Sequence, residues 1–143
     1  MQLLIAILLA YYVNIIVVKK NKSIELLIHV LDQYLEHLEE INNLTLKYIR
    51  EKEISDAHEI LWKLKKLSMS LQKIEQLYKL YPDDISTYPR NKMVEDLQNL
   101  KISITNDPFK QEKKYSSSQK IEILKNFEII ETKVLKEKKN LLG

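Results

Sequence analysis

Histidines and carboxylates are the side chains of this sequence that are best suited to chemistry. The three histidines are His29, His37 and His58, and His37 stands three residues before Glu40, so that the two could share one face of a helix as metal ligands. Carboxylate-bridged metal sites of helical bundles use Glu-x-x-His on two helices and one Glu from each of two more, and no Glu-x-x-His occurs here. We therefore expect solvated histidines and no metal ligands.

Other catalytic chemistries lack the residues that they need. The sequence has no cysteine, which removes disulfides, thiolate ligands and cysteine nucleophiles and leaves the redox compartment open. Its single glycine, Gly143, stands at the end, where it cannot form a phosphate-binding loop. No serine has the context of a hydrolase nucleophile, and Asp83–Asp84 is more typical of a polar turn than of a cation contact. The sequence predicts no catalytic residues, no cofactor and no enzyme activity.

Charge is distributed unevenly along the 143 residues. Residues 1–18 contain no ionisable side chain except two tyrosines, and Lys19, Lys20 and Lys22 then form a basic collar. Residues 23–108 carry a net charge of −4, and residues 109–143 carry +4. A total of +3 is too small to indicate nucleic acid. The basic tail could contact anionic lipid, although five interspersed glutamates favour an ordinary solvated helix face.

The first 18 residues are predicted to be a transmembrane anchor. Residues 3–18 read LLIAILLAYYVNIIVV, with Asn14 as the one strongly polar residue. As a helix, all 18 residues measure about 27 Å, at the short end for a bilayer core of roughly 30 Å. A cleaved signal peptide would carry its positive charges before the apolar run, and a buried helix of so small a domain would keep a polar stripe. The anchor is the preferred interpretation, and the signal peptide and the buried helix remain as alternatives.

The lysine collar predicts the orientation of that anchor. Lysine and arginine concentrate on the cytoplasmic flank of a membrane span, and here they follow the apolar run. We expect a single-pass membrane protein with its N-terminus outside and residues 19–143 in the cytoplasm.

The rest of the sequence has the apolar spacing of amphipathic helices. Four helices are expected, at about 23–50, 55–81, 91–105 and 117–139. Without Gly or Pro between them, the anchor and the first helix are expected to form one rod from about Leu3 to Arg50. In the first helix the apolar stripe is Ile24, Ile28, Leu31, Leu35 and Leu38, widened into one broad face by Leu27, Val30, Tyr34, Ile41, Leu44 and Tyr48. The apolar positions are Ala57, Ile60 or Leu61, Leu64, Leu67, Leu71, Ile74, Leu77 and Tyr81 in the second helix, Met93, Leu97, Leu100 and Ile104 in the third, and Ile123, Phe127, Ile130 and Val134 in the fourth.

Polar residues and prolines mark the expected helix ends. Ser55 or Asp56 could cap the second helix, Asn91 the third and the serines 116–118 the fourth, while Pro82 and Asn106-Asp107-Pro108 end the second and third. Asn42 and Thr45 fall on the apolar stripe of the first helix, either to fix register or to face water. The fold class is all-α, with an N-terminal transmembrane helix that continues into an antiparallel helical bundle or long coiled hairpin at 19–143.

Several of these residues have a spacing that resembles the LemA family of bacterial membrane proteins. The similar positions are Asn14, Asn21, Asp32 and Asn43-Leu44 in the first helix, and Tyr81-Pro82-Asp83, Met93, Leu97, Ile104 and Lys114-Tyr115 further on. The Ala-Trp and paired arginines of that family are absent here. The resemblance implies one N-terminal span, a long helix and an antiparallel bundle without an established activity.

The expected function is that of a non-enzymatic, membrane-anchored scaffold or interaction module. Its expected partners are the lipid bilayer and either an unidentified protein or a second copy of the chain, and no nucleic acid. The alternative is a coiled-coil component of a membrane apparatus, of the phage lysis or secretion type, with its body on the outer side.

Overall fold

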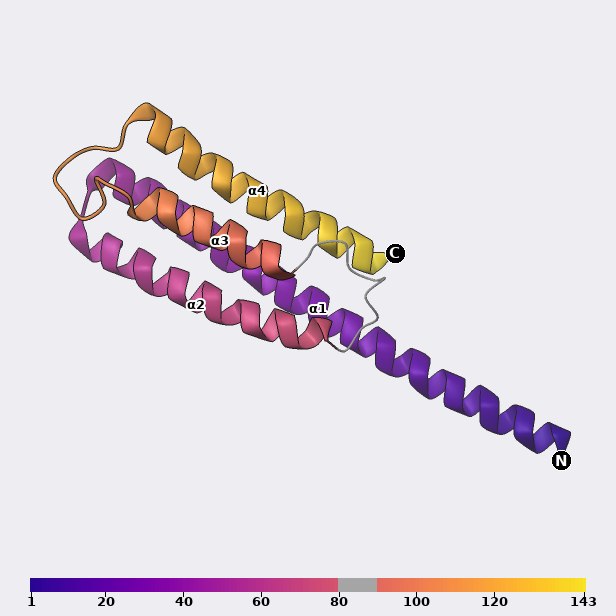
Figure 1. The fold of residues 1–143 in the computed structure, drawn as a ribbon. Coiled ribbons are helices and arrows are strands. Elements are labelled where there is room, and N and C mark those ends of the chain that lie inside the picture. The colour runs from indigo at the N-terminus through magenta and orange to yellow at the C-terminus, as the bar shows by residue number, and fades with distance from the viewer. Residues whose placement is uncertain (80–89) are drawn as a thin grey trace.

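The computed structural model of the chain describes residues 1–79 and 90–143, and all regular structure in these ranges is helical. Four helices follow one another: α1 (Gln2–Glu51), α2 (Ile54–Tyr78), α3 (Arg90–Thr105) and α4 (Ser117–Leu142) (Figure 1). The all-α prediction is confirmed. The expected helices at 55–81, 91–105 and 117–139 correspond to α2, α3 and α4, and Tyr81 and Pro82 lie outside the described residues.

The first helix is one unbroken rod of 50 residues. At 1.5 Å per residue it is about 75 Å long, and no Gly or Pro interrupts it. The expected continuity from Leu3 to Arg50 is confirmed, so the predicted helix at 23–50 is the second half of α1.

The second half of α1 packs side by side with the other three helices. α2 turns back along α1, α3 runs in the direction of α1, and α4 returns, so that the C-terminus lies near the point where α1 emerges (Figure 1). Both α1 and α3 contact α2 and α4, which places the helices around the core in the order α1, α2, α3, α4. We call residues 27–51 of α1 together with α2, α3 and α4 the helical body.

The core of the helical body is built from one apolar face of each helix. All the core positions predicted for α3 and α4 are buried. Of those predicted for α2, Leu77 is only partly buried and Tyr81 lies outside the described residues, while the others are buried, with Ile60 and not Leu61 in the core. In α1 the buried positions are Leu27, Leu31, Tyr34, Leu38, Ile41, Thr45 and Tyr48.

The broad apolar face predicted for α1 is confirmed, but its centre is rotated about the helix axis from the narrow stripe of Ile24, Ile28 and Leu35. Ile24, Ile28 and Leu35 are only partly buried and lie at the edge of the core. α1 touches two neighbours, so apolar residues cover a wide face, and hydropathy does not identify the centre of that face. Thr45 stands at this centre with 1% of its surface exposed, which excludes the alternative that it faces water.

Local hydrogen bonds explain where the helices begin and end. Ser116 caps α4 as expected, because its Oγ accepts from the Gln119 N–H while Gln119 Oε1 accepts from the Ser116 N–H. α3 ends at Thr105, before the predicted Asn-Asp-Pro break.

Two predicted caps are wrong. Lys52 adopts a left-handed conformation with φ 56° and ends α1 so sharply that α2 begins at once, with Glu53 and not Ser55 or Asp56 at its N-cap. Asn91 lies inside α3, which begins at Arg90.

Candidate functional site

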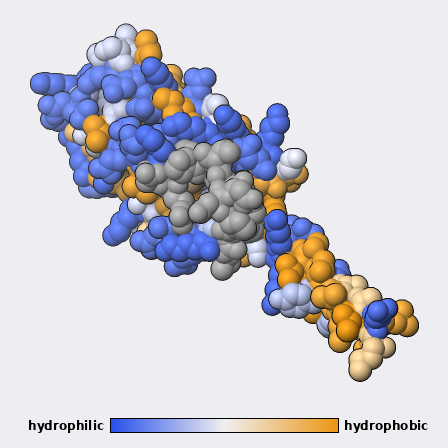
Figure 2. Space-filling model, turned by 45° about the vertical axis from the view of Figure 1, so that its right-hand side comes forward, coloured by the Kyte–Doolittle hydropathy of each residue, from blue (hydrophilic) through white to orange (hydrophobic). Residues whose placement is uncertain are grey.

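The N-terminal part of α1 is the most unusual surface of the structure. Residues 1–22 are all exposed, and the large apolar side chains between Leu3 and Val18 have 36–76% of their surface exposed. Figure 2 shows apolar side chains gathered on this protruding end, whereas the visible face of the helical body is mostly hydrophilic. An exposed apolar surface of this extent is typical of a membrane or interaction segment.

By length and composition, α1 contains one candidate membrane span near the N-terminus, and none of that span is buried. A core helix would be buried, so the alternative of a buried core helix does not describe residues 1–18. Lys19, Lys20 and Lys22 follow it as exposed side chains. Leu27, nine residues after Val18, is the first fully buried residue of α1.

The three histidines all lie on the surface of the helical body. His37 and Glu40 are exposed, and Glu40 forms an ion pair with Lys63 of α2 at 3.2 Å. The carboxylate that the sequence offered as a ligand beside His37 therefore stabilises the contact between α1 and α2. Asp83 and Asp84 lie outside the described residues.

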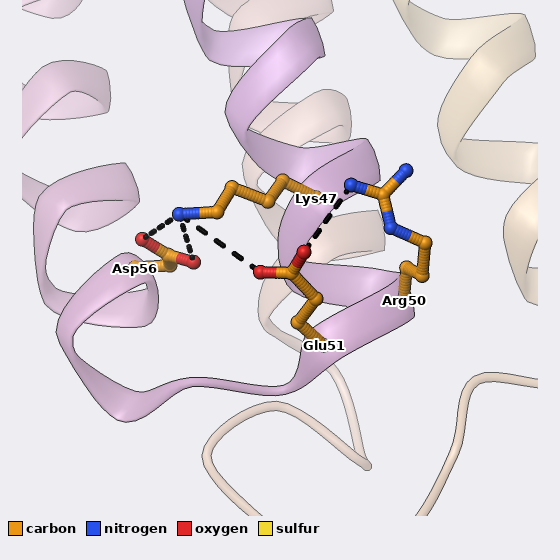
Figure 3. A network of polar contacts seen from close by, with 4 residues as sticks. All are labelled: Lys47, Arg50, Glu51 and Asp56. Carbon is orange, nitrogen blue, oxygen red and sulfur yellow. Dashed lines mark hydrogen bonds and ion pairs between the residues drawn. The ribbon is translucent and has the colours of Figure 1, made fainter.

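Three carboxylates meet where α1 turns into α2. Glu51, Glu53 and Asp56 each place an oxygen within 4.8 Å of the others, a spacing that could hold a cation. The chain already supplies cations there, since Lys47 Nζ lies 3.3 Å from Asp56 Oδ2 and 3.9 Å from Glu51 Oε2, and Arg50 contacts Glu51 at 3.3 Å (Figure 3). The hydrogen bond to Asp56 raises the pKa of Lys47. These contacts form an ion-pair network that holds the turn.

Several polar groups inside the helical body are paired across helices. The Tyr78 hydroxyl donates to Glu137 Oε1 at 2.7 Å, and Glu137 has none of its surface exposed. Lys133 Nζ of α4 contacts both carboxylate oxygens of Asp96 in α3, at 3.1 and 3.0 Å. These contacts link α2, α3 and α4 at fixed heights along the helical body.

Two buried tyrosines differ in how their hydroxyls are satisfied. The Tyr115 hydroxyl donates to the Ile104 carbonyl at 2.6 Å, whereas the Tyr34 hydroxyl is buried and has no hydrogen-bond partner in residues 1–79 and 90–143. Burial raises the pKa of both phenols, with nearby Asp96 adding to the effect at Tyr34 and Tyr48 adding to it at Tyr115.

A first groove, the acidic groove, lies between α1 and α4. It has a volume of about 460 Å³, and its lining carries four carboxylates, from Asp32, Glu36, Glu39 and Glu131. The apolar part of its lining consists of Leu35, Leu38, Phe127 and Leu135. Lys138 pairs with Asp32 at one end. The groove thus combines an apolar floor with an excess of negative charge.

A second groove, the basic groove, lies between α2 and α3. It has a volume of about 430 Å³, and its charged residues are Lys65 and Lys101. Its apolar part consists of Leu61, Leu64, Leu71, Val94 and Leu97. Like the acidic groove, it combines apolar side chains with charged ones, but its charges are positive.

Sequence reasoning missed both grooves and the buried Glu137. Grooves depend on which helices are neighbours, and periodicity within one helix does not contain that information. Glu137 does have a signal, because it continues the step of three and four residues set by Phe127, Ile130 and Val134. Its place in the charged run Lys136–Lys139 made the step look like the end of the core.

No protein family, curated protein or solved structure matches this chain. Its function is therefore argued from its geometry.

Proposed function

We propose that this chain is a single-pass, membrane-anchored antiparallel helical bundle that serves as a non-enzymatic scaffold or protein-interaction module, of the kind that the LemA resemblance implies. The observation that carries the proposal is the continuity of α1. One half of that helix is apolar on every side and exposed, and the other half forms part of a packed core.

The energetics favour insertion of the exposed half into a bilayer. Each Leu, Ile or Val near the centre of a span contributes about −0.3 to −0.6 kcal/mol to insertion. The eleven such residues between Leu3 and Val18 therefore supply roughly −3 to −6 kcal/mol. Asn14 opposes this gain, and its position near the inner end places it close to interfacial water or a neighbouring helix.

Lys19, Lys20 and Lys22 support an orientation with the N-terminus outside and the helical body in the cytoplasm. In an upright α1, Leu27 would lie about 13 Å beyond Val18, while the interfacial layer of a bilayer is roughly 5–8 Å deep. The helical body would then stand clear of the headgroups.

The lysines near the C-terminus would stand further away. Lys138 lies beside Asp32, which is about 21 Å beyond Val18 along the helix and so about 13–16 Å beyond the interfacial layer, more than one Debye length at physiological salt. For an upright helix, this distance favours the solvated-face interpretation of the basic tail over lipid contact.

Alkaline extraction of membranes tests the anchor in the full-length chain. The wild type is expected to stay in the membrane pellet. Leu8→Asp with Val13→Asp should release it, because two aspartates cost about 6 kcal/mol in a span, as much as the apolar residues contribute. Leu26→Asp with Leu46→Asp is the matched control, since both residues are exposed on the second half of α1 and should not change retention. Release of the wild type by alkali would overturn the proposal.

A C-terminal reporter that fluoresces only after folding in the cytoplasm tests the orientation. We expect fluorescence in intact cells. A dark fusion, together with protease access to the helical body from outside, would support the alternative of an outward-facing coiled-coil component.

A further inference from the structure

The acidic and basic grooves lie on opposite edges of the helical body. The helices surround the core in the order α1, α2, α3, α4, so the edge between α1 and α4 is the one opposite the edge between α2 and α3. One molecule thus presents a negatively charged apolar groove to one side and a positively charged apolar groove to the other.

Apart from Asp32, which pairs with Lys138, the charges that distinguish the grooves form no ion pair within the described residues. Glu36, Glu39 and Glu131 of the acidic groove are exposed, and so are Lys65 and Lys101 of the basic groove. None of the five forms an ion pair in the part of the chain that the structure describes. Exposed charges beside an apolar floor favour a partner with the opposite charges beside its own apolar surface.

Both grooves lie at the same height along the helical body. The acidic groove uses residues 32–43 of α1, and the basic groove uses residues 61–71 of α2. Because α2 runs opposite to α1 and Lys63 pairs with Glu40, residues 61–71 stand beside about residues 32–42 of α1. Two copies that stand upright on one surface would bring the two grooves level with each other.

α3 and α4, which border the grooves, expose large apolar side chains at and beside the grooves. On α3, Val94 and Ile102 are 54% and 48% exposed, and on α4, Leu124 and Leu135 are 44% and 47% exposed. Helices pack by placing the ridge of one into the groove of another. α4 of one copy has the apolar residues and the Glu131 carboxylate that suit the basic groove, and α3 has the apolar residues and the Lys101 amine that suit the acidic groove.

We propose that a second copy of this chain occupies these grooves, with the acidic edge of one copy packed against the basic edge of the next. The contact deepens the proposed function and rests on it, because anchors in one bilayer hold the copies parallel and at one height. The contact joins two different surfaces of the chain, so a dimer still has one free acidic edge and one free basic edge. Further copies can add at both. Copies would form rows along the membrane.

The absence of cysteine in the sequence makes cross-linking the direct test. Asn43→Cys places a thiol in the acidic groove and Gln98→Cys places one in the basic groove. The two full-length variants are mixed in phosphatidylcholine vesicles and oxidised. We expect disulfide-linked heterodimers in clear excess over the homodimers that either variant forms alone. A mixture of His37→Cys and His58→Cys, whose residues are exposed and line neither groove, is the control.

Charge reversal tests whether the two edges recognise each other. Lys65→Glu with Lys101→Glu in the Gln98→Cys chain should reduce heterodimers about tenfold, since two attractive surface pairs become repulsive. Glu36→Lys with Glu39→Lys in the Asn43→Cys chain should restore them. Circular dichroism of each variant checks that the helices remain.

The inference is overturned if Asn43→Cys and Gln98→Cys link no better than the histidine-site control, or if homodimers dominate. Alkaline extraction of the same vesicles keeps the two proposals apart. If the protein stays in the membrane but no disulfide forms between copies, only the groove-to-groove contact is contradicted. If alkali releases the protein, the membrane anchor is contradicted, whether or not the disulfide forms.

Discussion

At the residue scale, the buried tyrosines Tyr34 and Tyr115 allow a matched comparison of hydrogen bonding in the core. Removing an unpaired buried hydroxyl relieves a desolvation cost, whereas removing a donor from a paired carbonyl leaves that carbonyl unsatisfied. Tyr34→Phe should leave the free energy of unfolding unchanged or raise it by up to about 1 kcal/mol. Tyr115→Phe, which frees the Ile104 carbonyl, should lower it by about 1–2 kcal/mol. Urea unfolding of both variants measures the difference, and equal effects would contradict these assignments.

The same tyrosines make stability sensitive to alkali. Burial raises the pKa of both phenols above 10 in the folded state, so above pH 10 the unfolded chain releases protons that the folded chain retains. This contribution to stability is fully present below pH 10 and is lost as the pH rises. Ionisation of the two phenols in the unfolded chain should lower the free energy of unfolding by about 3 kcal/mol by about pH 11. Relative to the double variant Tyr34→Phe with Tyr115→Phe, the wild type should lose this amount between about pH 9 and 11, measured by urea unfolding. Parallel pH profiles would count against it.

At the element scale, the position of α1 in the core predicts which substitutions unfold the helical body. Leu31 is fully buried, whereas Leu35 is half-buried at the edge of the acidic groove. Leu31→Ala should lower the free energy of unfolding by about 3–4 kcal/mol, and Leu35→Ala by less than half as much. Thermal unfolding followed by circular dichroism compares them. A larger effect at Leu35 would mean that the centre of the buried face follows the narrow stripe of Ile24, Ile28 and Leu35.

The capping box of α4 predicts a smaller and local effect. Ser116→Ala removes the acceptor for the Gln119 N–H and should cost about 1 kcal/mol. Ser117, the first residue of α4, is exposed and does not act as the cap, so Ser117→Ala should change the free energy of unfolding by less than about 0.5 kcal/mol. A urea titration of the two variants is sufficient. Similar losses at both positions would show that helix propensity, and not the cap, sets the stability there.

The four helices were predictable from sequence because each carries its own apolar period. Met93, Leu97, Leu100 and Ile104 define a face without reference to any other helix. Features that depend on neighbours were not predictable. Thr45 and Glu137 are buried because three other helices surround them, and Glu53 replaces Ser55 as an N-cap because Lys52 turns the chain early. The grooves belong to pairs of helices and have no signature in either helix alone.

At the scale of the whole molecule, α1 divides into a part that supports the core and a part that does not. Asn21→Pro falls in the exposed part and should leave the thermal unfolding of the helical body nearly unchanged. Asn43→Pro falls within the body and should cost about 3 kcal/mol or more, because proline removes a helix hydrogen bond and clashes with the preceding turn. Circular dichroism melts of the two proteins test this division. Strong destabilisation by Asn21→Pro would mean that the protruding segment contributes to the core.

The unbroken helix also sets a rotational phase between its two ends. Each residue turns an α-helix by about 100°, so the 18 residues from Asn14 to Asp32 complete about five full turns. The one strongly polar residue of the apolar segment therefore points in the same direction as the acidic groove. A neighbour seated in that groove would stand on the Asn14 side of the anchor. One residue inserted after Lys20 would turn the groove away from Asn14 by about 100°, whereas four would turn it by only about 40°.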